Sequence, residues 1–570
     1  MKPRFYRTAV VVLLIAAAPA AWLWWDAGRY REAFPVFDAS GAACVIIVPA
    51  KATEPELAAA RLLSETLAAA AGRESRLFPV VRDHWWRAWQ RGIRVGNTRQ
   101  AGQLWLPGDS RLERPVGMAV GPRGVMLRSR WPEDIVAAAG WFLEKQAGAH
   151  WFMPGPLGAS VPRRAELRLA PGTVTAAPAF GSRHLGGLKT PAEAAWLGAN
   201  RLQAVITHGH SMSRIFQPED LARMPELAPL INWQKYFPTR PDEREWQPNL
   251  AAEPAVGHAV GVLRRQLTEA PAQVAVRLSM NDSIRYDQSK ETQALVGPPR
   301  YFRGRPDYSN LVFGFANKVA RGLAEEFPDR FISTYAYDWA ENVPAFRVEP
   351  NVVPYLTADR SQWFDPAFAA QDRDLMRRWL AAGPKVVGIY DYYEGAPHLV
   401  PRPTLYAVAQ SIPFAYEAGI RAFYAESLAN WGIDGPKSWL AAQLLWDAKQ
   451  DTAALLDTYY REFWREAAEP MREFFALCDR QWLEQPLPSY WLKYFKDEHQ
   501  ALRFPPEVRV ALRMRLEAAG RLARSDLVRR RLDFTSAAFA VTEAFCEFNE
   551  ARDRLSRLAL AGRLDPGAVV

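Results

Sequence analysis

The chain has 570 residues, 49% of them hydrophobic, and a formal net charge of +9, which excludes a disordered or fibrous protein and allows about two to four domains. Its basic residues are 12 lysines and 59 arginines spread through every region, so they indicate a composition bias rather than a groove for nucleic acid. Three scattered cysteines are too few for a disulfide framework or a zinc cluster. Aromatic residues make up 12% of the chain, enough to line a sugar site or to fill a large core.

The N-terminus predicts export. Lys2, Arg4 and Arg7 precede an apolar run over residues 8–25 that contains several small alanines. A basic flank before a short apolar stretch is typical of a secretory signal, and the tryptophans at its end equally suit an uncleaved anchor. We therefore predict that residues 1–25 are a signal peptide or a membrane anchor. We then expect the rest of the chain to be periplasmic or extracellular. Residues 8–25, if they are not cleaved, would anchor it to the inner membrane.

Residues 40–155 predict a small α/β domain. Apolar residues 43–49 indicate a buried strand, and residues 54–71 form an alanine- and leucine-rich helix that ends at Gly72. Further strands are expected at 92–95, 117–120 and 125–129, and a second helix over 132–146. A stretch rich in proline and glycine follows and connects this domain to the next.

Residues 178–435 predict a TIM-like (β/α)8 barrel. Short apolar strands alternate there with helices, which fits a barrel better than an open sheet. An eighth strand is expected near residues 196–199. The seven strands read directly from the pattern cover 180–184, 204–207, 275–279, 331–335, 352–356, 386–390 and 421–424. Residues 436–570 read as a C-terminal helical region, so the fold class is α/β with these three parts.

Polar residues that follow the barrel strands are the candidates for chemistry, because barrel enzymes build their sites at the C-terminal ends of the strands. Carboxylates, aromatic residues and histidines recur there, as expected of a carbohydrate cleft, and cleavage of a glycosidic bond needs two carboxyl groups. The candidates are His208, His210, Asn281, Asp282, Tyr337, Trp339, Asp391, Tyr392, Glu394, Glu426 and Trp431.

Each candidate also has a structural explanation. Asp282 fits a helix or turn cap, and Asp391 fits a residue that holds a loop through local hydrogen bonds. A buried glutamate is rare without a partner or a role, so Glu426 is harder to explain in this way. His208 and His210 have the spacing of a metal pair, but two histidines are a weak signal, and we predict no metal and no cofactor.

Several segments resemble known carbohydrate-active proteins. VIIVPAKATEPELAAARLLSETLAAAAG, IRVGNT and EDIVAAAGWFLEKQAGAHWFMPG resemble the N-terminal α/β domain of alpha-glucuronidases and beta-hexosaminidases. THGHS, LSMNDS, YSNLVFGFANKVA, YAYDWAENVP, YDYYEG and AFYAES resemble the bacterial domain-of-unknown-function family 4838, over about residues 43–480. The resemblance implies a carbohydrate-directed enzyme on a glycoside-hydrolase-like barrel. Asn281-Asp282 is similar to the Asn-acid pair of retaining barrel hydrolases, in which the acid is Glu.

These observations predict an exported glycoside hydrolase that acts on a polysaccharide or an envelope glycan. Asp282 is the expected general acid, with Glu426, or else Asp391, as the second carboxylate. Asn281 is expected to bind a sugar hydroxyl, and the remaining candidates to shape the subsite. The alternative is a non-catalytic glycan-binding or polysaccharide-assembly protein on a degenerate barrel. A binder of nucleic acid or phospholipid would need the arginines of the C-terminal helices to form one face, and a solvated helix face explains them better.

Overall fold

The computed structural model describes residues 32–87, 90–99, 104, 106–108, 110–394, 398–485 and 498–561. It divides into two compact units. Unit 1 comprises Met1–Trp151, Ala159–Pro178 and Ala195–Arg201, and unit 2 comprises Phe152–Gly158, Ala179–Ala194 and Leu202–Val570. The predicted export segment, residues 1–25, lies outside the described residues. Within the described part, no helix has both the length and the apolar character of a membrane span.

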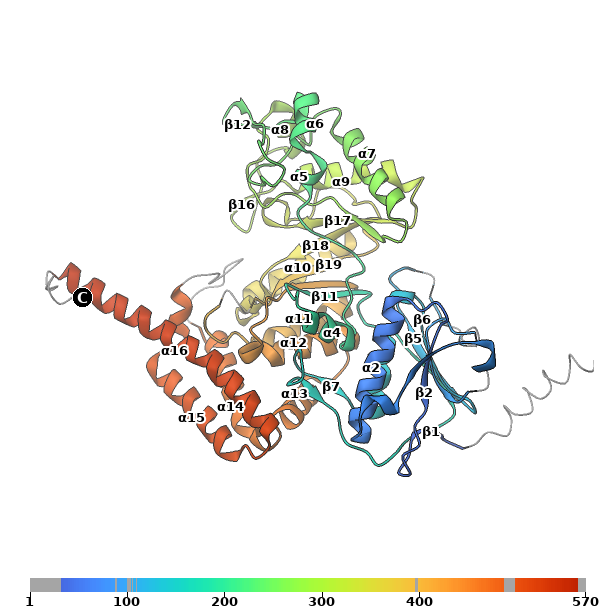
Figure 1. The fold of residues 1–570 in the computed structure, drawn as a ribbon. Coiled ribbons are helices and arrows are strands. Elements are labelled where there is room, and N and C mark those ends of the chain that lie inside the picture. Colours follow the sequence, from blue (N-terminus) through green and yellow to red (C-terminus); the bar gives the residue numbers. More distant parts are fainter. Residues whose placement is uncertain are drawn as a thin grey trace, which may run out of the picture. The chain divides into compact units, whose positions relative to one another are not determined.

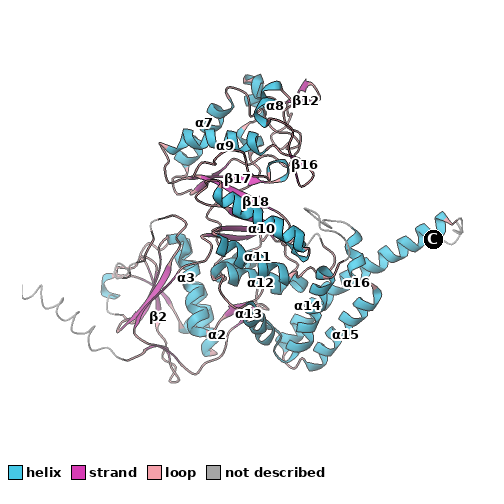
Figure 2. Cartoon of the chain, turned by 180° about the vertical axis from the view of Figure 1, so that it is seen from behind, coloured by secondary structure: helices cyan, strands magenta, loops and turns pink. Residues whose placement is uncertain are grey.

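Unit 1 contains a six-stranded sheet and the helices α2 (Glu54–Ala71) and α3 (Ile135–Phe142), which pack against each other (Figure 2). The strand order is β10-β5-β6-β4-β2-β3. Helix α2 (Glu54–Ala71) begins with a capping box between Thr53 and Glu56 and ends at Gly72, whose φ of 66° suits the left-handed stop. The other elements are β2 (Val45–Val48), β3 (Val80–Arg82), β4 (Gly92–Val95), β5 (Val116–Gly121), β6 (Gly124–Ser129), β10 (Gly172–Ala176) and α3 (Ile135–Phe142). A separate pair joins β1 (Phe34–Phe37) to β9 (Leu167–Leu169).

Unit 2 contains a six-stranded, all-parallel sheet in the order β11-β20-β19-β18-β17-β14 (Figure 1). The first strand of the sheet in sequence pairs with the last, so the sheet curls back on itself as in a barrel. Its strands are β11 (Ser182–Gly186), β14 (Ala275–Arg277), β17 (Phe331–Ala336), β18 (Val352–Thr357), β19 (Gly388–Tyr392) and β20 (Ala422–Glu426). Between them lie α7 (Ala255–Glu269), α9 (Ser309–Ala324), α10 (Pro366–Ala381) and α11 (Leu405–Ala418). The predicted fold class is confirmed, with a partial barrel of six paired strands.

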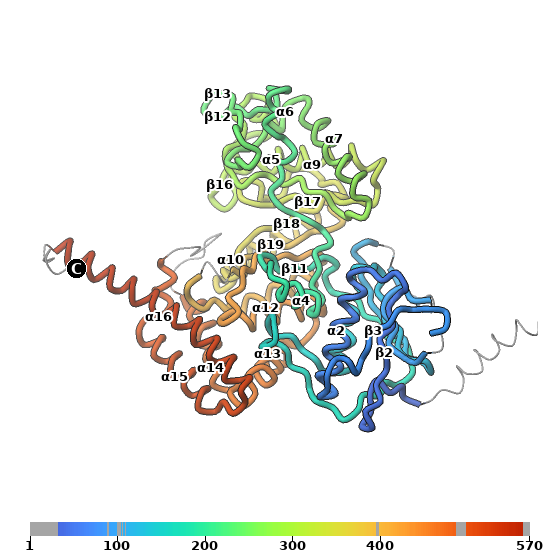
Figure 3. Tube along the Cα trace, in the orientation of Figure 1, coloured from blue at the N-terminus to red at the C-terminus, as the bar shows by residue number. Residues whose placement is uncertain are grey.

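Two of the predicted barrel strands are wrong. Residues 196–199 belong to helix α4 (Pro191–Ala199), and residues 204–207 form no strand. The segment 203–210, which can be followed between α4 and α5 in Figure 3, is held by side-chain hydroxyls instead. Ser182 Oγ accepts the N–H groups of Val205 and Ile206 at 3.1 and 3.0 Å, and Ser333 Oγ donates to the Thr207 carbonyl at 2.6 Å. These bonds and two isolated bridges occupy the place between β11 and β14 where a ladder would lie.

A small excursion and a helical region complete unit 2. The excursion leaves after residue 210 and holds α5 (Met212–Ile215), α6 (Pro218–Arg223), β12 (Leu230–Ile231), β13 (Gln234–Lys235) and α8 (Lys290–Val296). The helical region holds α12 (Trp431–Trp446), α13 (Thr452–Tyr459), α14 (Ala468–Leu483), α15 (Pro506–Leu522) and α16 (Asp526–Leu560), packed on a shared apolar core.

The C-terminal arginines are partly used inside the helical region. Arg513 of α15 forms an ion pair with Glu543 of α16, and Arg531 is buried and donates to the Leu157 carbonyl at 2.7 Å. These residues therefore stabilise helix packing, which leaves fewer of them for a basic binding face.

Candidate functional site

The inner face of the barrel sheet is lined with tyrosines. Side chains alternate between the two faces of a strand, and the register places partners of neighbouring strands on the same face. Tyr390 pairs with Tyr424, and Tyr392 pairs with Glu426. Gly388 makes room for this packing, because a Cβ atom there would lie 2.7 Å from the ring of Tyr355. The same face carries His184, Arg277, Ser333, Tyr335, Tyr355, Tyr390, Tyr392, Tyr424 and Glu426.

Glu426 ends β20 at the mouth of this barrel. Tyr390 donates its hydroxyl hydrogen to Glu426 Oε2 at 2.9 Å. Burial, followed by the neighbouring tyrosines and the negative charge of Glu426, raises the pKa of Tyr390 far above its ordinary value. Tyr390 is therefore a fixed donor that orients the carboxylate at the C-terminal edge of the sheet.

Asp282 lies at the same edge, beyond β14. Tyr337, which follows β17, donates to Asp282 Oδ1 at 2.9 Å. Asp282 is exposed to solvent, so the apolar surroundings expected for a general acid are not found around it. Its neighbour Asp338 has a left-handed φ of 51° and faces Arg305 Nε at 3.4 Å. Burial and the charge of Asp282 raise the pKa of Asp338, against the lowering effect of Arg305.

Tyr392 connects the two acidic groups. Its ring lies 5.4 Å from that of Tyr390, which binds Glu426. Burial raises the pKa of Tyr392 well above its ordinary value, and the charges of both Glu426 and Asp282 act in the same direction. The negative charges of the two predicted carboxylates therefore both raise the pKa of Tyr392.

The two histidines complete the mouth. His208 Nδ1 lies 3.1 Å from the Tyr335 hydroxyl, and its ring is 4.3 Å from that of Tyr424. Burial lowers the pKa of His208 to about 3, so His208 is a neutral imidazole at physiological pH. His210 Nδ1 pairs with the Met280 carbonyl, a bond in which Nδ1 is the donor. In the described part of the chain, no three His, Cys, Asp or Glu residues gather at metal-binding distance.

Asp391 is not part of this mouth, and its predicted role as the second carboxylate is corrected. It pairs with Ala425 and therefore points to the opposite face of β19 from Tyr390 and Tyr392. It is 1% exposed, and its Oδ1 accepts the N–H groups of Arg360 at 3.0 Å and Tyr392 at 2.8 Å. Asp391 thus holds the loop after β18 against β19.

Asp391 gives a testable pH dependence of stability. Burial raises its pKa to about 6, so its contribution to folding is fully present below about pH 4 and is lost as the pH rises through 6. Both N–H donors use Oδ1, which Asp391→Asn retains. Relative to the parent, this variant should gain on the order of 2–3 kcal/mol in unfolding free energy between pH 4 and pH 7. Urea unfolding at several pH values measures the difference, and parallel pH curves for the two proteins would contradict it.

Asn281 and Glu394 are also placed differently from their predicted roles. Asn281 is fully buried, its Oδ1 accepts the N–H of Ser213 at 2.9 Å, and its Nδ2 donates to the Trp246 carbonyl at 2.7 Å. Its amide joins two loops, and its full burial keeps it from a sugar hydroxyl. Glu394 is 1% exposed, and its charge acts on the buried Arg402 as well as on Tyr392 and Tyr424 of the mouth.

The two predicted tryptophan platforms lie in packed surroundings. Trp339 stacks on Tyr286 with ring centroids 5.7 Å apart and an interplanar angle of 10°, next to Tyr308. Trp431 begins α12, donates from Nε1 to Glu193 at 3.1 Å and packs against the helical core. Both side chains are half-buried and contribute to packing against neighbouring residues of the protein.

Sequence reasoning missed several residues of the mouth. Tyr335, Tyr390, Tyr424 and Arg277 were inside predicted strands and were read only as strand residues. Their signal was available, since polar residues at every second position of an apolar strand mark a polar inner face. Asp338 follows a predicted strand and reads from the sequence as a solvated loop residue, whereas its left-handed backbone and its pairing with Arg305 follow from the tertiary structure.

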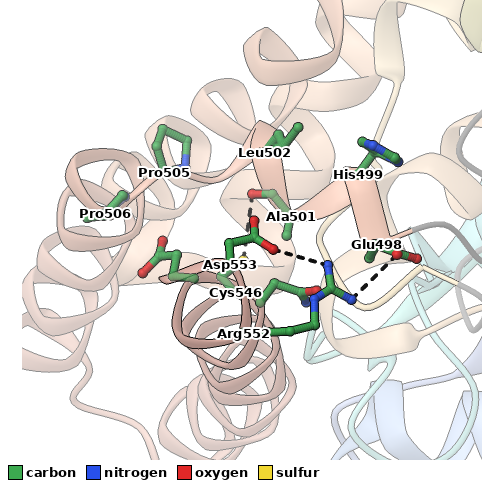
Figure 4. A pocket seen from close by; sticks show the side chains of 11 residues that line it. Glu498, His499, Ala501, Leu502, Pro505, Pro506, Cys546, Arg552 and Asp553 are labelled. Carbon is green, nitrogen blue, oxygen red and sulfur yellow. Dashed lines mark hydrogen bonds and ion pairs between the residues drawn. The ribbon is translucent and has the colours of Figure 1, made fainter. Parts of the chain in front are cut away.

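A hollow lies in the helical region, between η11 (Glu498–Arg503) and α16 (Figure 4). It measures about 310 Å³. Arg552 pairs there with Glu498 and Asp553 at 3.4 Å each, so its charge is already balanced. The barrel mouth remains the candidate site, because it combines ordered carboxylates with aromatic rings.

Fold and site together define a partial-barrel protein with an acidic, tyrosine-lined mouth. The chain belongs to the family described as "Domain of unknown function (DUF4838)", whose model matches residues 153–476. This confirms the resemblance found in the sequence for the barrel. A search of curated proteins finds no match.

Solved glycoside hydrolases show weak similarity to the chain. A GH138 enzyme targeting pectin rhamnogalacturonan II is 10% identical, with a TM-score of 0.40 over 88% of this chain and 86% of the enzyme. The N-acetyl-beta-hexosaminidase of Streptomyces plicatus is 13% identical, with a TM-score of 0.39 over 77% and 92%. A family 89 glycoside hydrolase from Clostridium perfringens is 7% identical, with a TM-score of 0.40 over 84% and 60%. Similarities this low decide no activity for the chain.

Proposed function

We propose that the chain is an exported glycoside hydrolase that cleaves O-glycosidic bonds of a polysaccharide or an envelope glycan. The observation that carries the proposal is the pair of tyrosine-bound carboxylates at one edge of the sheet. Tyr390 binds Glu426, and Tyr337 binds Asp282. Tyr335 lies between the two tyrosines, 5.4 Å from Tyr390 and 6.4 Å from Tyr337, so aromatic rings run from one carboxylate to the other.

The two sides of the mouth suit different parts of the reaction. Glycosidic cleavage needs one carboxylic acid to protonate the leaving oxygen and one carboxylate as nucleophile or base. Burial and the charge of Asp282 raise the pKa of Asp338, so Asp338 retains a proton more readily than an isolated carboxyl group. We assign the acid to Asp282 and Asp338, and the second carboxylate to Glu426. Residues 1–25 would direct export, with cleavage or anchoring both compatible with the activity.

A screen of the mature protein against a glycan library for release of reducing ends tests the proposal. Release by the parent and its loss in Asp282→Asn would support it. A glycan that binds the parent but is never cleaved would favour the alternative, a non-catalytic glycan-binding protein. The exposure of Asp282 is the observation that suits this alternative. No binding and no release across the library would contradict both.

The acidic pair predicts opposite pH shifts for two variants. Asp338→Asn removes the carboxyl group whose pKa is raised, so the alkaline limb of kcat/KM should move to lower pH. Arg305→Gln removes the cation that lowers the pKa of Asp338, so the limb should move to higher pH. The pH profiles of the parent and both variants on one released substrate measure this. Shifts in the same direction would contradict the assignment.

A further inference from the structure

Arg277 is an arginine of the barrel interior that has no acidic partner. It ends β14 and pairs with Ser333 of β17, so it lies on the inner face and is half-buried. Among the residues that the structure describes, no carboxylate forms an ion pair with it. Arg360 and Arg402, which are buried in the same unit, each meet an aspartate at 3.1 and 2.7 Å. Among the described residues, Arg277 therefore differs from Arg360 and Arg402 in having no carboxylate partner.

A second arginine, Arg214, comes two residues after Met212. The Met212 N–H donates to the carbonyl of Ser279 at 3.2 Å, and Ser279 lies two residues beyond Arg277. Arg214 belongs to α5, is exposed, and has no carboxylate partner in the described part of the chain either. Burial lowers the pKa of Arg277, and the positive charge of Arg214 is the next contribution in the same direction. Two guanidinium groups that repel each other and share no anion are stabilised when an anion binds between them.

Gly209 lies beside the guanidinium of Arg277, which is half-buried. A Cβ atom at Gly209 would lie 3.5 Å from Nη1 of Arg277. Gly209 has a φ of 145°, which other residues rarely adopt, so the chain keeps a residue without a side chain there. The other groups facing Arg277 are the Tyr335 hydroxyl and His208, which is neutral. No competing negative charge is found among them.

We propose that Arg277 and Arg214 form a subsite for the carboxylate or sulfate group of an acidic sugar. The inference rests on the proposed function and names its substrate class. A guanidinium offers two parallel N–H donors that match a carboxylate or a sulfate. His208 binds Tyr335, whose ring contacts that of Tyr390, the partner of Glu426, so the subsite adjoins the acidic mouth. An acidic glycan would place its charged group at the arginines and its neutral rings against the tyrosines.

Matched ligands test the proposal. Binding of oligogalacturonate and of its methyl ester, measured by calorimetry on the full chain, compares the same sugar with and without its charge. Dextran sulfate and dextran provide the same comparison for sulfate. At least one charged ligand should bind roughly 10- to 100-fold more tightly than its neutral partner, with the difference falling at high salt. The arm that shows the difference identifies the anion.

Variants connect the effect to the two arginines. Arg277→Gln should remove most of the preference for the charged ligand, Arg277→Lys should restore part of it, and Arg214→Gln should weaken it without affecting folding, since Arg214 is exposed. Arg223→Gln, which removes the same charge from an exposed ion pair, is the matched control and should bind like the parent. Equal binding of charged and neutral ligands, or an unchanged preference in both variants, would overturn the subsite. If the parent cleaves a glycan and Arg277→Gln keeps the full preference for the charged ligand, the hydrolase proposal stands and the subsite falls.

Discussion

Replacing Glu426 by glutamine is expected to lower kcat on a cleaved glycan by roughly 10²- to 10⁴-fold. Glutamine keeps an oxygen that can accept the Tyr390 hydroxyl hydrogen at the position of Glu426 Oε2, so the tyrosine network and the fold should persist. What it loses is the negative charge at the reacting carbon. KM should therefore change little, and steady-state kinetics with the purified variant separates the two effects.

Two comparisons make this prediction specific. Glu325→Gln removes the same charge from an exposed position outside the mouth and should retain the activity of the parent. Asp282→Asn should show a loss similar to that of Glu426→Gln, and the double variant should lose little more, because the two groups act in one reaction. Full activity in both single variants would exclude this carboxylate pair.

The contrast between Glu426 and Asp391 shows where the sequence was sufficient and where it was not. Both were read as residues at the end of an apolar strand. Both strands run two residues beyond their predicted ends, so both residues lie inside a strand: Glu426 on the inner face and Asp391 on the opposite face. The same two-residue error left Glu426 on the inner face but made Asp391, whose side chain points outward, a candidate for the mouth. Hydrophobic pattern locates strands, but their ends depend on pairing with neighbours that the pattern does not show.

The segment 203–210 shows a second limit. Its apolar residues predict a strand, and their position between β11 and β14 is that of a barrel strand. Its hydrogen bonds go to the hydroxyl groups of Ser182 and Ser333, which lie far away in the sequence. Local propensity cannot foresee such partners. By contrast, helix α2 carries its own start and stop signals, Thr53 with Glu56 and Gly72, and was predicted with its observed bounds.

The second large effect concerns stability and the ion pair beneath the mouth. Arg402 Nη2 donates to both carboxylate oxygens of Asp359 at 2.7 and 2.8 Å, and both side chains are fully buried. Removing one partner of such a pair leaves a charge in a low dielectric without compensation. We expect Arg402→Met to reduce the unfolding free energy by roughly 3–5 kcal/mol, measured by denaturant unfolding. Arg264→Met, which breaks an exposed pair with Glu326, should cost only about 0–1 kcal/mol.

A double variant distinguishes the pair from simple packing. Asp359→Asn retains an oxygen for the N–H of Ser361 but carries no charge, so combining it with Arg402→Met removes the uncompensated carboxylate. The double variant should therefore be more stable than Arg402→Met alone. If the two losses add, Arg402 acts through its bulk and the ion pair contributes nothing. Because Arg402 Nη1 also donates to the Tyr392 carbonyl at 3.0 Å, the pair fixes the end of β19. The double variant also lacks the hydrogen bond from Arg402 to Tyr392. If it is more stable than Arg402→Met but cleaves glycans poorly, the activity of the mouth depends on this hydrogen bond as well as on the balance of charge.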